Sequence, residues 1–235
     1  MTAKPLAESL EEAFQHCCEM DASLADRLQA LADAVQTLSP PFAETVDRLV
    51  LRLQQSNAGA TAPQPGDPMP PFVLPDEKGH LVTLDNLLSN GPVAVTFHRG
   101  HWCPYCRINT DALAKAQKEI AAEGGQVIAV MPDRQQFAAA FKSDLNASFP
   151  VLTDLDNGYA LSLNLAIWVG EEMAQFISAA GWDIPRFQGN ASWVLPIPAT
   201  FVVGQDGRVK SRFVDPDYRK RMAISDLISA LRSAH

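Results

Sequence analysis

The chain has 235 residues, of which 47% are hydrophobic and 20% are charged, which indicates a folded protein with one full core and a smaller appendage. A formal net charge of -8 argues against nucleic acid or an anionic membrane as a partner, because binding phosphates requires clustered Lys and Arg. The sequence starts without the apolar run of a signal peptide and contains no stretch suited to a membrane span, so we expect a cytoplasmic protein.

The first part of the chain predicts three amphipathic helices. Apolar residues recur at helical spacing from Leu6 to Leu38 and again from Phe42 to Leu53, with Pro40-Pro41 between the two stretches. Such helices cannot bury their apolar faces alone. We therefore expect residues 1–55 to be a helical extension, either a cap on the following domain or a homodimerisation module, and residues 56–65 to be a linker.

The rest of the chain, residues 66–235, alternates strand and helix patterns as a sheet covered by helices requires. Short buried strands are predicted at 93–97 and 126–130, and we expect these two strands to pair. Residues 199–203 and 209–214 are predicted to form a hairpin across the turn Gly204-Gln205-Asp206-Gly207. Helices are predicted directly after Cys106, around 137–141, around 173–180 and over 224–231.

Two cysteines stand one helical turn apart directly after the first of these strands. Pro104 suits the first turn of a helix, where a missing amide hydrogen costs nothing, so Cys103 should stand at the helix start. The partial positive charge of a helix start favours a thiolate. We therefore expect Cys103 to be the more acidic, accessible nucleophile and Cys106 the more buried, resolving thiol.

Half of a zinc site and a static disulfide are the alternatives for this pair. Zinc would need a second pair of ligands, and the only other cysteines, Cys17 and Cys18, lie far upstream in a predicted helix. The sequence therefore favours a redox dithiol, and we expect neither a metal ion nor a cofactor.

Several segments together carry a family resemblance: 66–76, Trp102-Cys103, 130–133, 149–154 and 192–203. With them, the chain from about residue 63 onward resembles the peroxiredoxin-like branch of the AhpC/TSA (alkyl hydroperoxide reductase / thiol-specific antioxidant) superfamily. The resemblance implies an α/β fold of the thioredoxin-like kind. This would be a three-layer sandwich with a central mixed sheet, here preceded by the N-terminal helical extension.

The resemblance also implies a substrate-binding surface around the dithiol. Thioredoxin-like proteins hold a cis proline opposite their cysteines, and Pro198 matches that position. A cis bond there would leave the backbone of Ile197 free to pair with an extended substrate. Trp102, Pro104 and Tyr105 flank the cysteines and complete the predicted surface.

The resemblance does not identify which cation lies beside the reactive cysteine. Peroxiredoxins typically carry a Thr or Ser three residues before the reactive cysteine and an Arg on a later strand, but here these positions hold Gly100 and a proline. Arg99, His101 or Arg107 could supply a cation instead, although Arg99 and His101 alternate in direction on an extended segment. The run Arg219-Lys220-Arg221 is expected to be solvated surface.

The predicted function is a thiol-dependent peroxidase. The thiolate of Cys103 attacks a hydroperoxide, becomes a sulfenic acid and condenses with Cys106 to a disulfide, which thioredoxin or glutathione reduces. The alternative is a dithiol-disulfide oxidoreductase acting on protein disulfides, which the Cys-Pro-Tyr-Cys spacing and Pro198 favour. A third hypothesis is an interaction protein that works through its N-terminal helices and carries a vestigial redox domain, but the intact cysteine pair argues against it.

Overall fold

The centre of the molecule is a five-stranded mixed sheet, described here from a computed structural model that covers residues 6–234. The strand order is β5-β4-β3-β8-β9. β3 (Val93–Phe97), β4 (Gln126–Met131) and β5 (Val151–Thr153) run parallel. β8 (Ala199–Val203) is antiparallel to both β3 and β9 (Val209–Val214). The mixed sheet and the pairing of the first two predicted strands are confirmed.

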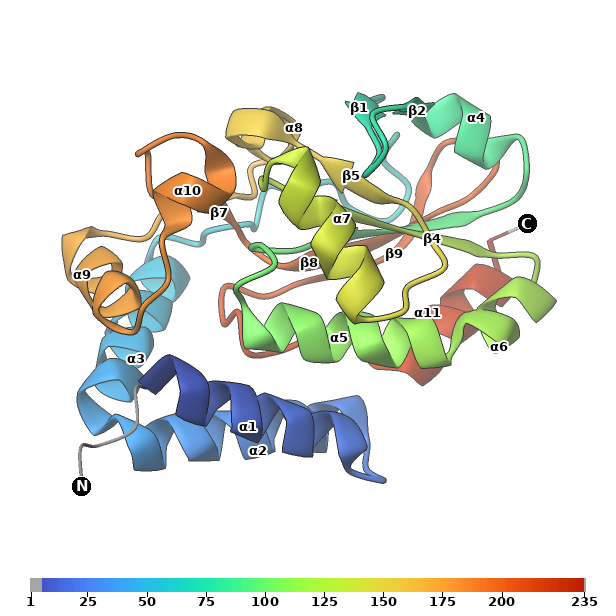
Figure 1. The fold of residues 1–235 in the computed structure, drawn as a ribbon. Coiled ribbons are helices and arrows are strands. Elements are labelled where there is room, and N and C mark those ends of the chain that lie inside the picture. Colours follow the sequence, from blue (N-terminus) through green and yellow to red (C-terminus); the bar gives the residue numbers. More distant parts are fainter. Residues whose placement is uncertain (1–5, 235) are drawn as a thin grey trace.

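Helices cover both faces of this sheet and produce three layers (Figure 1). Alternate residues of β3 serve the two faces: Ala94 joins one apolar cluster, while Val95 and Phe97 join the other. The first face is covered by α5 (Pro104–Lys115), α6 (Gln117–Ala122), α7 (Gln135–Asp144) and α11 (Ile224–Arg232). The second face is covered by α4 (Leu84–Leu88) and α8 (Gly158–Ser162).

Several short elements that the sequence did not predict complete the domain. They are β1 (Val73–Pro75) with β2 (Leu81–Thr83), β6 (Ala166–Trp168) with β7 (Val194–Pro196), the 3₁₀ turn η1 (Leu155–Asn157) and α10 (Ile184–Gln188). A strand of three residues offers too few positions for an alternating pattern. The predicted helix around 173–180 is present as α9 (Glu171–Ala179).

Three N-terminal helices pack on the domain: α1 (Leu6–Glu19), α2 (Leu24–Leu38) and α3 (Pro40–Gln55). Figure 1 shows α1 and α2 side by side beneath α5, and both contact that helix, whereas α3 contacts α9. Their buried side chains belong to the same apolar cluster as α5, α7 and α11. Two ion pairs fix them to α5, Arg107 with Glu11 and Arg27 with Asp111.

The segment 56–65, predicted as a linker, lies against β9. Ala62 is 1% exposed, and the carbonyls of Ala62 and Pro63 accept hydrogen bonds from Arg212 Nη1 at 2.6 and 3.1 Å. No helix within residues 6–234 is both long and apolar enough to cross a membrane.

Candidate active site

The dithiol stands where β3 passes into α5. Cys103 is the N-cap residue of α5 and Pro104 is its first helical residue, as predicted. Gly100 has a φ of +143°, a value that disfavours other residues. A Cβ at Gly100 would also lie 2.5 Å from Trp102 Nε1 and 2.7 Å from Asp133 Oδ1. The loop that leads to the cysteines therefore requires glycine at this position.

Both sulfurs are shielded from solvent. Cys103 is 1% exposed and Cys106 is 0% exposed, and both are free thiols. The prediction that Cys103 is accessible is wrong for this structure, because side chains of the N-terminal helices and of residues 171–182 cover it. A cavity of only about 20 Å³ lies beside Cys103, and its walls from these two regions are Leu10, Val35, Phe42, Ile177 and Trp182.

Two donors hold the sulfur of Cys106. The backbone N–H of Arg99 and Nη2 of Arg221 each lie 3.3 Å from Cys106 Sγ. Burial alone would raise the pKa of Cys106, but a hydrogen bond from the Cys103 thiol and the charge of Arg221 lower it well below its usual range. Of the two thiols, Cys106 therefore loses its proton more readily.

Cys103 has the opposite tendency, which corrects the expectation that it is the more acidic thiol. Burial raises the pKa of Cys103 well above its usual range, and its hydrogen bond to Cys106 raises it further. The side chain of Cys103 accepts no hydrogen bond from the first turn of α5. The helix start thus gives its sulfur no direct donor, so the effect expected from the helix start does not offset the effect of burial.

Arg99 is the predicted cation that lies against the dithiol. Its side chain is buried, with its guanidinium carbon 3.8 Å from the ring centroid of Tyr218 and 5.0 Å from that of Trp102. Burial alone would lower the pKa of Arg99, but Tyr218 and the two thiols raise it, so the residue stays charged. Within residues 6–234, Arg99 has no carboxylate partner.

The other two predicted cations are engaged elsewhere. His101 Nε2 lies 2.8 Å from Asp144 Oδ2 at the edge of the site. Arg107 makes a two-point contact with Glu11 of α1, at 2.5 and 3.0 Å. Arg107 therefore fastens α1 to α5 and does not face the sulfurs.

Asp133 is a buried carboxyl group that sequence reasoning missed. Its Oδ2 accepts the backbone N–H of His101 at 2.7 Å, while Oδ1 has no partner in the described part of the chain. Burial raises the pKa of Asp133 to about 7, against the effect of the His101 hydrogen bond, and the charge of Cys106 adds to the rise. Asp133 stands two residues after the end of β4, at the edge of the sheet where the carboxyl ends of parallel strands meet, which is the one signal that could have indicated it.

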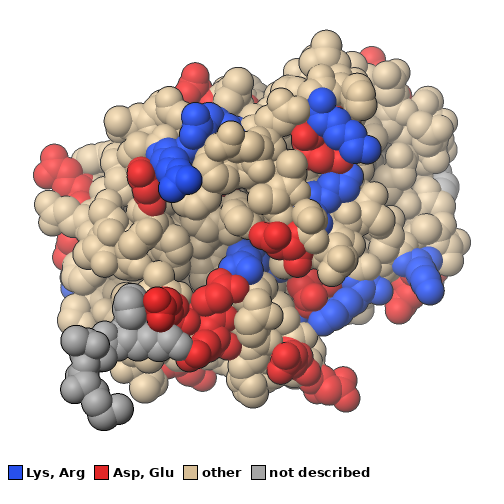
Figure 2. Space-filling model, in the orientation of Figure 1, with Lys and Arg blue, Asp and Glu red and all other residues tan. Residues whose placement is uncertain are grey.

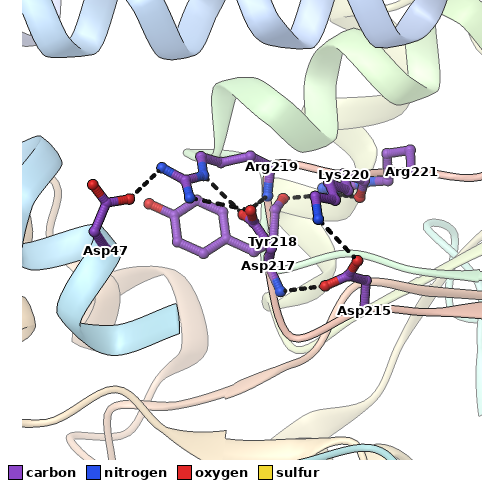
Figure 3. Close-up of polar contacts among 7 residues, drawn as sticks. All are labelled: Asp47, Asp215, Asp217, Tyr218, Arg219, Lys220 and Arg221. Carbon is purple, nitrogen blue, oxygen red and sulfur yellow. Dashed lines mark hydrogen bonds and ion pairs between the residues drawn. The ribbon is translucent and has the colours of Figure 1, made fainter. Parts of the chain in front are cut away.

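Arg221 was also missed, and the prediction that its run of basic residues is solvated surface is wrong at this position. Figure 3 shows Arg219 between Asp47 and Asp217, and Lys220 paired with Asp215. Arg221 extends away from these carboxylates and donates to Cys106, 115 positions earlier in the chain. Its local sequence carries no sign of this contact.

The predicted substrate-binding residues fall into two groups. Trp102, Pro104 and Tyr105 line the cavity beside Cys103. Ile197 and Pro198 line a separate cavity of about 10 Å³, which also contains Arg99. The predicted cis bond at Pro198 is wrong, because the described residues contain no cis peptide bond. Pro198 stands directly before β8, and a trans proline is accommodated at a strand start because no ladder hydrogen bond is lost there.

The surface adds one observation. On the face shown in Figure 2, acidic and basic side chains are interspersed, with several acidic groups near α1 and no broad basic patch. No cluster of three or more His, Cys, Asp or Glu side chains suited to a metal ion occurs between residues 6 and 234.

Comparison with known proteins gives concordant results. The model of the AhpC/TSA family matches residues 65–212. The thiol-disulfide oxidoreductase ResA of Bacillus subtilis is 26% identical over 153 residues, which are 65% of this chain and 68% of that protein.

Solved structures share the fold. Peroxidoxin BcpB from Mycobacterium tuberculosis superposes with a TM-score of 0.57 at 21% identity, over 74% of this chain and 99% of that chain. Yeast mitochondrial 1-Cys peroxiredoxin, whose thiol resolving mechanism runs via glutathione/thioredoxin systems, superposes with a TM-score of 0.52 at 16% identity, over 70% and 73% of the two chains. These likenesses establish the thioredoxin-like fold.

Proposed function

Because the chain belongs to the AhpC/TSA family, we propose that it is a thiol-dependent enzyme that reduces hydroperoxides through Cys103 and Cys106. The observation that carries the proposal is the buried dithiol itself. Two donors lie against Cys106 Sγ and favour its ionisation over that of Cys103, and the adjoining cavity admits a small oxidant only. The similarity to ResA and to solved peroxiredoxins supports redox chemistry at this pair.

Cys103 is the proposed nucleophile because it lines the cavity through which a peroxide would arrive. It passes its proton to Cys106 and attacks the nearer peroxide oxygen, so that the O–O bond breaks and Cys103 becomes a sulfenic acid. The departing alkoxide or hydroxide takes the proton from Cys106. The restored Cys106 thiolate then attacks the sulfur of Cys103, forming the disulfide and releasing hydroxide, which a solvent proton converts to water.

Arg99 supplies the electrostatic part of this reaction. Its guanidinium lines the same cavity as Cys103 and has no carboxylate to neutralise it within the described residues. A fixed cation beside the O–O bond stabilises the charge that develops on the leaving oxygen, in a site that excludes water. Arg99 thus takes the place of the Thr or Ser and the Arg that peroxiredoxins typically carry, at positions where this chain has Gly100 and Pro198. Trp102, Pro104 and Tyr105 shape the space around the peroxide.

The N-terminal helices act as a cap in this proposal. The buried face of α1, with Leu10, Phe14 and Cys17, is already packed against the domain and is not free to form a dimer interface. A thioredoxin or glutathione system in a reducing cytoplasm would return the disulfide to the dithiol.

A dithiol-disulfide oxidoreductase is the second candidate. The similarity to ResA and the Cys-Pro-Tyr-Cys spacing favour it. The burial of both sulfurs under α1 to α3 argues against it, since a disulfide on a protein surface could not reach Cys103 in this arrangement.

Stopped-flow oxidation tests the proposal. The reduced protein is mixed with hydrogen peroxide and followed by tryptophan fluorescence, because Trp102 lines the cavity beside Cys103. We expect a rate constant well above that of free cysteine. Cys103→Ser should abolish the fast phase. Cys106→Ser should oxidise more slowly, because the proton acceptor is lost, and should accumulate a sulfenic acid that dimedone traps. Cys17→Ser, a matched buried thiol in α1, should leave the rate unchanged.

Two results would overturn the assignment. One is a rate no faster than that of free cysteine, and the other is a fast phase that survives Cys103→Ser. The second candidate is tested with Cys106→Ser, which should trap a mixed disulfide with an oxidised protein substrate only if that candidate is right.

A further inference from the structure

A groove separate from the peroxide cavity lies between α2 and the segment that follows β9. Its volume is about 460 Å³, within the range of sites that hold small molecules. One wall is a single face of α2 formed by Ala25, Leu28, Gln29 and Ala32. The opposite wall is formed by Phe213, Asp217, Arg219, Lys220 and Arg221. Nothing in the peroxidase mechanism above uses the cavity of this groove.

The basic side chains that line this groove differ in how closely carboxylates pair with them. Arg219 is held by Asp47 and Asp217 at 2.7 and 2.8 Å, and its charge is therefore compensated (Figure 3). Lys220 is 57% exposed and lies 3.4 Å from Asp215, a loose pair that an incoming anion can compete with. Arg221 has no carboxylate partner in the part of the chain that the structure covers. Lys220 therefore offers an exposed cation to a ligand, whereas Nη1 and Nη2 of Arg221 already donate to the carbonyls of Tyr218 and Lys220 and to Cys106 Sγ.

The groove also reaches a residue that contacts the dithiol. Arg221 forms part of its wall, and the same guanidinium lies 3.3 Å from Cys106 Sγ. The Nε of Arg221 is buried and makes no hydrogen bond to residues 6–234. A ligand in the groove is thus separated from the sulfur of Cys106 by a single side chain.

Resting on the proposed function, we propose that this groove binds the reductant, and that the reductant is a low-molecular-weight thiol bearing carboxylates. Such a molecule fits the groove, and a carboxylate on it matches the exposed ammonium group of Lys220. A thioredoxin-like protein is too large to enter the groove, whereas a small thiol bound there is separated from Cys106 by the Arg221 side chain alone. The enzyme then receives oxidant beside Cys103 and reductant beside Cys106.

The exchange balances with two molecules of thiol. The first, as a thiolate, attacks Cys106 of the Cys103–Cys106 disulfide, so that a mixed disulfide forms and Cys103 leaves as a thiolate. The second attacks the sulfur of the bound ligand and releases Cys106, whose negative charge Arg221 stabilises. The ligand departs as its own disulfide, and the enzyme has gained the two electrons.

Reduction by two thiols of opposite charge tests the proposal. The full-length protein is oxidised with diamide, so that the reduction step can be measured whether or not the protein reacts with peroxide. Glutathione, which is anionic, and cysteamine, which is cationic, are then used in turn as the reductant. To remove the difference in intrinsic reactivity, the rate of each thiol with the protein is divided by its rate with a small-molecule disulfide. We expect glutathione to be favoured, with a preference that falls as salt is added.

Variants locate the binding site. Lys220→Gln should lower the glutathione rate about threefold without lowering the cysteamine rate, since one exposed charge contributes little more than this and repels rather than attracts the cationic thiol. Lys118→Gln removes the same charge from the exposed surface of α6 and is the matched control. Ala32→Phe should lower the glutathione rate about tenfold by filling the groove, with thermal unfolding confirming that the variant is folded.

Three outcomes would overturn the inference. They are equal normalised rates for the two thiols, an effect of Lys220→Gln no larger than that of Lys118→Gln, and reduction by thioredoxin that exceeds reduction by glutathione and is insensitive to Ala32→Phe. A protein that fails to react with peroxide but follows the expected glutathione pattern would contradict the proposed function and leave the groove assignment standing.

Discussion

The sulfur of Cys106 is held by donors from two distant parts of the chain, the backbone of Arg99 and the guanidinium of Arg221. A buried thiolate without such partners would be costly, because removal from water penalises the charged form. The two donors compensate this cost and keep the dithiol ionised. The reactivity of the pair thus depends on a residue that belongs to neither the loop nor the helix of the cysteines.

Replacing Arg221 should weaken this ionisation. In Arg221→Gln, the pKa of Cys106 should move upward because the positive charge beside its sulfur is lost, and the peroxide rate at pH 6 should fall by about fivefold. Thiolate absorbance near 240 nm measures the titration directly. Arg219→Gln is the control, because Arg219 lies in the same segment but is paired with Asp47 and Asp217. It should leave the pKa of Cys106 unchanged. An unchanged titration in Arg221→Gln would contradict the role of this residue.

At the scale of elements, α1 is the helix that shields the nucleophile. Leu10 is 1% exposed and forms part of the wall of the cavity beside Cys103, while Glu11, the next residue, is bound by Arg107 of α5. Access to Cys103 therefore depends in part on how tightly α1 packs against α5.

Truncating Leu10 should open the site. Leu10→Ala removes buried methyl groups, which costs about 2 to 5 kcal/mol in the free energy of unfolding. It should also raise the alkylation rate of Cys103 by iodoacetamide about tenfold under native conditions, measured by mass spectrometry of the labelled peptide. Leu231→Ala in α11 is the control, since Leu231 is equally buried but lines no cavity near the sulfurs. Equal alkylation in the two variants would show that α1 does not control access.

At the scale of the whole molecule, Asp133 links stability to pH. Its pKa is 3.8 when the side chain is fully solvated and about 7 in the folded protein, so between these values the unfolded chain loses a proton that the folded protein keeps. This group alone should lower the free energy of unfolding by about 1.4 kcal/mol for each pH unit in that window, with no further change above it.

Asp133→Asn should therefore remove part of the pH dependence. Urea unfolding of the reduced protein at pH 5 and pH 7.5 should show a smaller loss of stability in the variant than in the parent protein. Asp21→Asn, in the exposed turn between α1 and α2, serves as the matched control. If the variant and the parent lose the same stability between the two pH values, Asp133 is already ionised in the folded protein.

Local signals predicted the parts of the fold that depend on neighbouring residues. The junction of β3 with Cys103 and Pro104, and the hairpin of β8 and β9, follow from strand composition, helix-start chemistry and a glycine turn. The sequence offered Arg99, His101 and Arg107 as cations that could face the sulfurs. Only the packing of Arg99 against the rings of Trp102 and Tyr218 selects it among the three.

The remaining features depend on contacts between distant parts of the chain. Arg221 is far from Cys106 in sequence, and Leu10 is far from Cys103, so no spacing rule joins them. The same packing buried Cys103, which made the expected accessibility wrong, and gave the donors to Cys106, which reversed the expected acidity. A sequence pattern reports the periodicity of one element but not which side chains of another element lie against it.

The attachment of residues 56–65 to β9 decides how the dithiol can be uncovered. Arg212 donates to the carbonyls of Ala62 and Pro63, so the chain leaving α3 is tied to the sheet and offers no hinge there. While these hydrogen bonds hold, the three N-terminal helices remain attached to the sheet at the end that follows α3. The opening that leaves this attachment intact is the separation of α1 from α5, which would expose Cys103 while α3 stays in place.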